Sequence, residues 1–163
     1  MRIERGDVTD LDRIADLWVD LAREMRTYGA RVRPDDNREA IREHLAHALV
    51  ADRVHVVREA DRVLGFLSHR TDEDGLATDG TRATLTYGYV VPDRRGEGIG
   101  TELFETAHSD LAAAGHDSVA LEVMADNEAA RRLYRRLGYD PHRVELAKPL
   151  DPPESDNHSR DDA

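Results

Sequence analysis

Apolar residues recur at helical spacing in two segments near the start of the chain. In residues 37–49, aliphatic side chains fall on one face. In residues 11–25, the repeating positions are Leu11, Ile14, Ala15, Trp18, Leu21, Ala22 and Met25. Repeats at i, i+3 and i+4 place side chains on one side of a helix. Both segments are therefore predicted to be amphipathic helices, with Trp18 and Met25 in the core.

Shorter segments with β-branched or alternating residues predict strands. One strand is expected at residues 3–8, and residues 54–58 and 63–68 are expected to pair as an antiparallel hairpin. Residues 85–91 alternate in character, which predicts a strand with two different faces. Gly88 inside this strand permits a bulge or the close approach of another backbone.

The second half of the chain predicts a strand–helix–strand unit. Residues 101–114 have a helical pattern that stops at Gly115, and residues 119–123 form a short apolar strand. A crossover of this length predicts a right-handed connection between parallel strands. A helix at residues 127–137 and a last strand at residues 143–150 complete the predicted order.

Length and composition predict one domain and a tail. We place the domain at residues 1–150 of the 163, and we expect residues 151–163, which are acidic and hold two prolines, to be disordered. The absence of cysteine excludes disulfides, thiolate metal sites and a cysteine nucleophile. No apolar stretch approaches the roughly 18 residues of a membrane helix. We therefore expect a cytoplasmic protein without a membrane partner.

The charge balance is strongly acidic. The formal net charge is −11, and Lys148 is the only lysine among 23 basic residues. An acidic, lysine-poor surface keeps a protein soluble in concentrated salt, so we hypothesise a halophilic host. An ordinary acidic domain with arginine-rich codon usage is the alternative. No basic patch stands clear of the acids, which argues against nucleic acid as a partner.

A glycine-rich turn reads Arg95-Gly96-Glu97-Gly98-Ile99-Gly100 and precedes the helix that begins at Thr101. Glycines let a backbone approach a ligand, and free N–H groups at a helix start favour an anion, so the turn predicts a phosphate site. A Walker loop would need a lysine before Thr101, and a dinucleotide fingerprint would need its third glycine one residue later. A turn without a ligand is the other alternative.

A second motif runs from Asn127 to Tyr139 and reads Asn-x-x-Ala-x-x-Leu-Tyr-x-x-Leu-Gly-Tyr. Together, the two motifs resemble the GCN5-related N-acetyltransferase (GNAT) family. The resemblance covers about residues 3–150 and is dense only over residues 85–139. It implies an α/β (α+β) fold, with a mixed twisted sheet of six or seven strands and about four helices on both faces.

The resemblance also implies acetyl-CoA as co-substrate and an amine as acceptor. In the family the glycine motif holds the pyrophosphate, and the strand before it lines the pantetheine arm. An unpaired N–H near the end of that strand is expected to polarise the thioester carbonyl. The implied cofactor contacts are Tyr89, Val90, Val91, Arg95, Gly96, Glu97, Gly98, Ile99, Gly100, Thr101, Asn127 and Tyr134.

Two side chains are expected to take part in the reaction, and no metal is. Tyr134 matches the family's proton donor to the CoA sulfur, with a packing tyrosine as the alternative. Glu122, in a strand facing the cleft, is the expected base, as in the family's ribosomal-protein acetyltransferases; a structural or exposed carboxylate is the alternative. Many members take a base from the strand that ends at Val91, where this chain has only Tyr87 and Tyr89. A water-mediated or absent base therefore stays open.

The expected function is acetyl transfer from acetyl-CoA to a primary amine, on a small molecule or on a peptide or protein, by direct attack. The alternative is a non-catalytic GNAT-fold module that binds acetyl-CoA or CoA as a sensor or regulatory subunit. A homodimer is also open, because dimers are common in the family and the final strand is a candidate edge.

Overall fold

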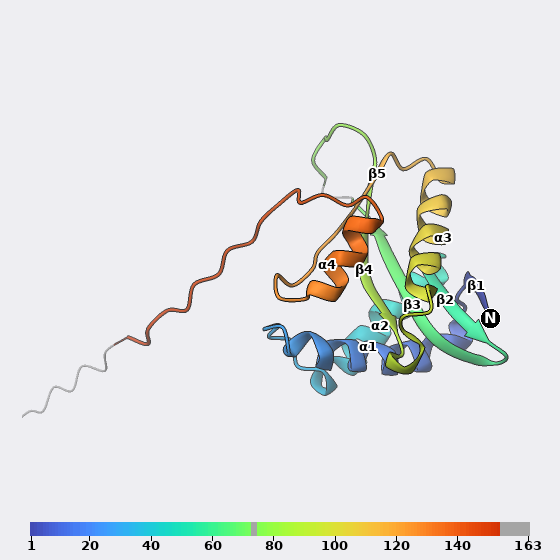
Figure 1. Cartoon of the computed structure of the whole chain (residues 1–163), viewed down its shortest axis with the longest axis horizontal. Coiled ribbons are helices and arrows are strands. Elements are labelled where there is room, and N and C mark those ends of the chain that lie inside the picture. Colours follow the sequence, from blue (N-terminus) through green and yellow to red (C-terminus); the bar gives the residue numbers. More distant parts are fainter. Residues whose placement is uncertain (73–74, 154–163) are drawn as a thin grey trace, which may run out of the picture.

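One mixed sheet organises the chain (Figure 1). In this computed structural model, which describes residues 1–72 and 75–153, the strands lie side by side in sequence order. They are β1 (Arg2–Arg5), β2 (Val54–Glu59), β3 (Arg62–Thr71), β4 (Arg82–Val90) and β5 (Ser118–Leu121). The first four pair antiparallel, and β5 runs parallel to β4. The predicted hairpin and parallel crossover are confirmed, but the described residues form five strands instead of six or seven.

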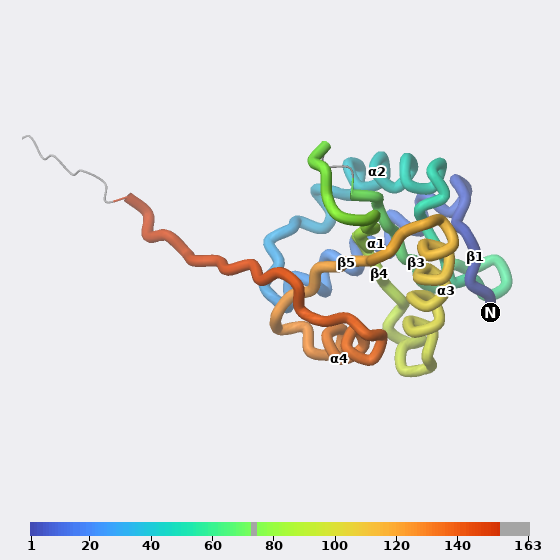
Figure 2. The backbone as a smooth tube through the Cα atoms, turned by 90° about the horizontal axis from the view of Figure 1, so that it is seen from above, coloured from blue at the N-terminus to red at the C-terminus, as the bar shows by residue number. Residues whose placement is uncertain are grey.

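The described chain has four α-helices (Figure 2). They are α1 (Leu11–Arg26), α2 (Arg38–Val50), α3 (Ile99–Ala113) and α4 (Glu128–Arg136). Their bounds lie close to those that periodicity predicts. Helices α1 and α2 pack together on one face of the sheet, and α3 crosses the other (Figure 2). Short 3-10 turns precede α1, α2 and the glycine-rich turn; they are Val8–Asp10, Asp35–Asn37 and Pro92–Arg94.

The core lies on both sides of β2 and β3, which form the middle of the sheet. Leu17 of α1 and Leu45 of α2 are fully buried on one face, and Leu103 of α3 is buried on the other. Trp18 is buried as predicted, whereas Met25, near the end of α1, is only half-buried. Since both faces are covered, the open parts of the sheet are its edges and the end of β4.

Strand β4 separates from β5 half-way along its length. Their pairing ends at Leu85 and Leu121. On its other edge, β4 has a register shift that leaves Thr86 as an extra residue, with its hydroxyl 2.8 Å from that of Ser68. A β-bulge bends a strand and increases its twist. The bulge therefore lies at Thr86, two residues before Gly88, the position at which the sequence permits a bulge. Residues 86–90 have no partner strand on the β5 side of β4.

The segment after α4 does not form the predicted last strand. Residues 140–150 are exposed and have no regular structure, and both views show them leading away from the sheet (Figures 1 and 2). The prediction of a strand at residues 143–150 is wrong in this structure, because no described strand lies beside them to share backbone hydrogen bonds. Residues 154–163 of the predicted tail lie outside the described residues. Among the described helices, none combines the length and hydropathy that a bilayer crossing requires.

Candidate functional site

The glycine-rich turn forms a backbone cradle at the start of α3. Gly96 and Gly98 adopt left-handed conformations, with φ of +79° and +81°, which favour glycine. Gly98 is the N-cap of α3, and no side chain caps the helix. A Cβ atom added at either glycine would meet no other atom within 4 Å. The space over the turn is therefore open to a ligand.

The N–H groups of residues 96–101 have no acceptor within the described part of the chain. The groups on either side are in use, because Arg95 N donates to Pro92 O at 3.2 Å and Glu102 N donates to Gly98 O at 3.0 Å. The helix dipole adds to the attraction of these free donors for an anion. The turn can therefore hold phosphate through the backbone of residues 96–101, but not through the N–H of Arg95.

The side chain of Arg95 ties the end of β4 to α1. Its two terminal nitrogens donate to the carboxylate oxygens of Glu24, both at 2.8 Å, and its Nε donates to Val90 O at 2.8 Å. The guanidinium also lies 5.1 Å from the ring centroid of Tyr89. The hydrogen bonds to Glu24 raise the pKa of Arg95. In this conformation Arg95 positions the strand end instead of pointing at the cradle.

Arg94 holds the carboxylate of Glu97 at the rim of the turn. Its Nε donates to Glu97 at 2.9 Å, and a terminal nitrogen donates to Glu59 at 2.6 Å. The bonds from Arg94 also lower the pKa of Glu59. A free carboxylate would repel a diphosphate. Arg94 therefore compensates the negative charge of Glu97, the one acidic side chain within the motif.

Val90 presents its backbone to the open edge of β4. The next N–H, that of Val91, donates to Leu64 O at 2.9 Å on the β3 side. Backbone groups alternate sides along an antiparallel strand, so the N–H and C=O of Val90 point the other way. The bond from Arg95 Nε to Val90 O agrees with this direction. The free N–H that the sequence predicts at this strand end therefore belongs to Val90, and that of Val91 is already used.

Helix α4 places Tyr134 against α3. Its ring centroid lies 5.5 Å from that of Phe104 and 5.8 Å from that of Tyr139. Burial raises the pKa of Tyr134, and its hydroxyl has no partner among the described residues. Asn127 is the buried N-cap of α4, and its Oδ1 accepts a hydrogen bond from Ala130 N at 3.2 Å. The packing of Tyr134 against α3 and the cap at Asn127 are thus observed.

Glu122 lies one residue beyond the end of β5. It is exposed, and its carboxylate makes no hydrogen bond or ion pair with the described residues. The expectation that it belongs to a strand is wrong, because β5 ends at Leu121 where β4 diverges from it. Its side chain is free to meet a ligand.

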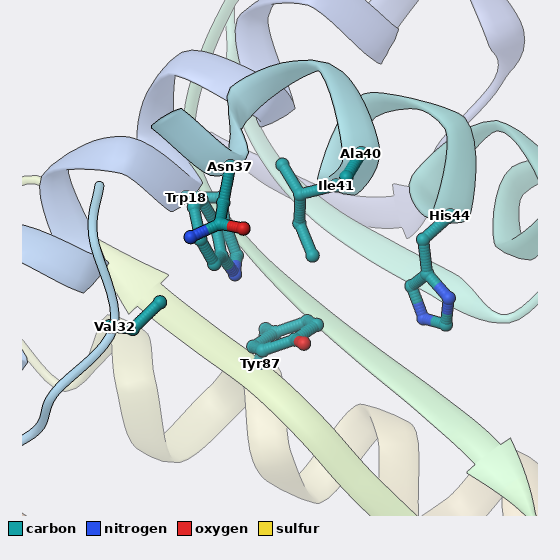
Figure 3. A pocket seen from close by; sticks show the side chains of 7 residues that line it. All are labelled: Trp18, Val32, Asn37, Ala40, Ile41, His44 and Tyr87. Atoms are coloured by element: carbon teal, nitrogen blue, oxygen red, sulfur yellow. The ribbon is translucent and has the colours of Figure 1, made fainter. Parts of the chain in front are cut away.

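A cavity of about 320 Å³ lies between the α1–α2 layer and β4 (Figure 3). Tyr87 of β4 lies across from α2, and its ring meets Trp18 and His44 edge to face, with centroids 5.9 Å and 6.3 Å away. Asn37 donates its Nδ2 to Arg33 O at 2.7 Å, which leaves its Oδ1 as an acceptor. Among the described residues, no carboxylate lines this cavity. The lining residues are Trp18, Val32, Asn37, Ala40, Ile41, His44 and Tyr87.

His44 is a titratable group that sequence pattern alone did not select. Its position one turn after the buried Ile41 was the only available signal. Its ring contact with Tyr87 depends on how α2 crosses the sheet, which the sequence pattern does not predict. Among the described residues, no cluster of three or more His, Cys, Asp or Glu side chains is placed to hold a metal.

The geometry combines an anion cradle, a free strand edge and an aromatic cavity on one sheet. The family model described as the acetyltransferase (GNAT) family matches residues 14–139. The chain belongs to the GNAT family. The five-stranded sheet and four helices of the described residues agree with the GNAT fold, although the expected count of six or seven strands was too high.

Several relatives match about half of this chain. A mycothiol acetyltransferase from Clavibacter sepedonicus is 39% identical over 85 residues, which are 52% of this chain and 26% of that protein. N-alpha-acetyltransferase 30 from Schizosaccharomyces pombe is 36% identical over 85 residues, 52% of this chain and 55% of that one. This chain therefore covers about a quarter to a half of these curated relatives. The crystal structure of a tetramutant of BH1408 from Bacillus halodurans matches with a TM-score of 0.76 at 24% identity, covering 92% of this chain and 100% of that one, which shows the fold alone.

Proposed function

We propose that this GNAT chain is an acetyl-CoA-dependent N-acetyltransferase that acts on a primary amine by direct attack. The observation that carries the proposal is the row of free N–H groups at residues 96–101, next to the free edge of β4. A diphosphate fits the first feature, and the amide-containing pantetheine arm fits the second. The family match supports the same pairing of substrate and site.

In the proposed complex, the diphosphate binds the backbone of residues 96–101 and the pantetheine amides pair with β4 near Gly88. The thioester carbonyl then meets the N–H of Val90. As the amine attacks, a C–N bond forms and the carbonyl oxygen gains negative charge, which this N–H stabilises. Collapse of the tetrahedral intermediate breaks the C–S bond and expels the CoA thiolate.

Tyr134 donates the proton that the departing thiolate takes up. Burial raises its pKa, so the hydroxyl stays protonated at neutral pH and is available as a donor. Its hydroxyl also has no competing partner among the described residues. Tyr134 then recovers a proton from solvent, which completes the cycle without an acyl-enzyme.

We consider two groups as candidates for removing the proton from the amine. Glu122 is exposed and unpaired beside the diverging strands, and we propose it as the base. His44, which meets Tyr87 in the aromatic cavity, is the second choice. The two candidates are distinguished by the variants Glu122→Gln and His44→Gln. Loss of the true base lowers kcat and leaves the affinity for acetyl-CoA unchanged. If neither variant lowers kcat, the amine is deprotonated by water.

The aromatic cavity is the proposed place for the group that carries the amine. Trp18, Tyr87 and Ile41 favour an apolar neighbour, and Asn37 Oδ1 can accept one hydrogen bond. A lysine, with an ordinary pKa of about 10.4, needs more help from a base to lose its proton than an α-amino group near 8 does. We therefore propose an α-amino group or a small amine beside an apolar side chain as the preferred acceptor.

Thermal unfolding with and without acetyl-CoA, followed by free-thiol release with an amine panel, tests the proposal. Ligand at about a hundred times its dissociation constant should add roughly 2.7 kcal/mol of stability. A shift together with turnover supports the enzyme. A shift without turnover on any amine favours the sensor alternative. A folded protein that shows no shift contradicts the cofactor assignment.

A further inference from the structure

The carboxylate of Glu24 is tied to the end of β4 through a single arginine. Glu24 lies near the C-terminal end of α1, and each of its carboxylate oxygens accepts a hydrogen bond from a terminal nitrogen of Arg95, both at 2.8 Å. The exposed side-chain fractions are 29% for Glu24 and 40% for Arg95, so water reaches the pair only in part. A two-fold bond between arginine and carboxylate fixes the direction of the guanidinium as well as its position.

The third bond of the same guanidinium holds Val90. Arg95 Nε donates to Val90 O at 2.8 Å, so one planar group joins α1 to the last residue of β4. The guanidinium also lies over the ring of Tyr89, with its carbon 5.1 Å from the ring centroid. A lysine has a compact ammonium on a flexible stem and does not fix these directions together. Glu24 therefore acts on the strand end through the rigid fork of an arginine.

Strand β5 does not hold Val90, because its pairing with β4 ends at Leu85. On the other side of β4, the bond from Val91 N to Leu64 O fixes the following residue to β3. The N–H and C=O of one residue in an antiparallel strand point to the same side. A bond that fixes the C=O of Val90 therefore fixes the direction of its N–H as well.

We propose that Glu24 is a positioning residue for acetyl transfer, which acts through Arg95 to aim the N–H of Val90 at the thioester carbonyl. This role rests on the proposed function, in which that N–H stabilises the negative charge of the carbonyl oxygen. A donor of this kind is effective when it already points at the oxygen before the charge develops. Glu24 supplies that fixed direction from the neighbouring helix without touching either substrate.

The kinetic test compares two carboxylates of α1 that each bind an arginine. Glu24→Gln replaces two charged acceptors with one neutral acceptor. It should lower kcat about tenfold, less than the ~10²–10³-fold loss that follows removal of an oxyanion donor. The KM for acetyl-CoA should stay within about twofold, because the cradle at residues 96–101 is untouched.

Asp16→Asn is the matched control. Asp16 Oδ1 accepts bonds from Arg38 at 2.8 Å and 3.0 Å, so the control also removes a charged partner from an arginine. This pair joins α1 to α2 and not to β4, so kcat should be unchanged. Equal kcat values in Glu24→Gln and Asp16→Asn would overturn the positioning role.

A double-mutant cycle separates positioning from a direct action of Glu24 on the substrates. A carboxylate that acts through Arg95 has no effect once Arg95 is replaced. The double variant Glu24→Gln/Arg95→Gln should therefore turn over no more slowly than Arg95→Gln alone. Losses that multiply in the double variant would show that Glu24 acts independently of Arg95, and they would contradict the proposal.

Nuclear magnetic resonance of protein labelled with ¹⁵N-valine tests the positioning without turnover. The amide signal of Val90 should move in Glu24→Gln and stay in place in Asp16→Asn, with both variants folded. An unmoved signal in Glu24→Gln overturns the proposal even where the natural chain is active. If the natural chain acetylates no amine, the proposed function fails, and the amide signal alone decides whether Glu24 orients Val90.

Discussion

Tyr134 and Tyr139 are neighbouring tyrosines whose hydroxyl groups have different surroundings. Their ring centroids are 5.8 Å apart, and burial raises the pKa of both. The hydroxyl of Tyr139 is hydrogen-bonded to His108, whereas that of Tyr134 has no hydrogen-bond partner in the described chain. A hydroxyl without a structural bond is the one available to a departing thiolate. The pair therefore provides a matched comparison at the scale of single residues.

We predict that Tyr134→Phe lowers kcat on the order of 10²-fold, because it removes a proton donor. The affinity for acetyl-CoA should be unchanged, since the ring and its packing remain. The raised pKa keeps Tyr134 protonated below its ordinary value of about 10, so this group should cause no loss of activity from neutral pH to about pH 9. Steady-state kinetics and calorimetric binding measure both quantities.

Tyr139→Phe is the control for this prediction. It should lower the free energy of unfolding by breaking the bond to His108, and it should leave kcat near that of the natural protein. If Tyr134→Phe turns over as fast as this control, Tyr134 is a packing residue and the thiolate leaves without its help.

A second group of titratable residues lies away from the proposed site, between the sheet and α3. His55 and His69 are buried, with ring centroids 6.4 Å apart. Burial lowers the pKa of His69 from 6.5 to about 4, and the nearby His55 adds to this effect. Burial also lowers the pKa of His55, although its Nε2 lies 2.7 Å from Asp110 Oδ2. Both imidazoles are therefore neutral in the folded protein at pH 7.

We predict that acid destabilises the fold through His69. Its folded pKa is below its unfolded pKa, so the unfolded chain binds more protons. The contribution to stability is fully present above pH 6.5 and is lost as the pH falls toward 4, by on the order of 3 kcal/mol. Denaturant unfolding at several pH values between 4 and 7.5 should show this slope.

His69→Gln should flatten the loss of stability with acid, because the group that must be protonated is gone. His47→Gln is the matched control, since His47 is exposed on α2 and should leave the slope intact. Identical slopes in the two variants would mean that other groups cause the acid sensitivity.

At the scale of elements, helix α3 carries a left-handed glycine at each end. Gly98 has φ of +81° and Gly115 has φ of +94°, and a Cβ at either position would meet no atom within 4 Å. A side chain costs roughly 1–2 kcal/mol of backbone strain in this conformation. The strain is similar at both ends, but only the first end carries the free N–H groups. The two glycines therefore separate a structural effect from an effect on the cofactor.

We predict that Gly98→Glu abolishes the thermal shift produced by acetyl-CoA, since bulk and negative charge enter the space over the cradle. Gly115→Glu should lower the melting temperature at least as much, because a carboxylate at a helix C-terminus is unfavourable. It should nevertheless retain the shift. Loss of the shift in both variants, or in neither, would contradict the placement of the diphosphate at residues 96–101.

Local pattern predicted the elements better than it predicted their pairing. Helices α1 to α4 follow from apolar periodicity and glycine stops, and the open turn at residues 96–101 follows from the spacing of its glycines. Strand pairing depends on the partner. The bulge at Thr86 arises opposite Ser68, and the alternation of residues 143–150 describes a strand without saying which edge it meets. Contacts between distant elements also depend on how those elements pack. The ion pair of Arg95 with Glu24 and the ring contact of His44 with Tyr87 could therefore not be predicted.

At the scale of the whole molecule, acidic residues outnumber basic ones by 34 to 23. Arginines pair with acids across elements, as when Arg38 meets Asp16 and Arg42 meets Asp12 between α2 and α1. Exposed pairs of this kind contribute about 0–1 kcal/mol each and are weakened by salt. The unpaired acids repel one another, and salt weakens that repulsion as well. The two effects have opposite signs, so salt dependence shows which is larger.

We predict that the fold becomes more stable from low to multimolar KCl, because the repulsion among acids outweighs the attraction within the ion pairs. The Debye length falls from about 30 Å at 0.01 M to about 3 Å at 1 M, so simple screening is complete near 1 M. A gain of about 1 kcal/mol would raise Tm by about 2–4 °C. If stability stops rising near 1 M, screening of an ordinary acidic surface is sufficient. A further rise above 1 M is what a halophilic protein requires, whereas equal stability at both ends of the range would contradict the halophilic hypothesis.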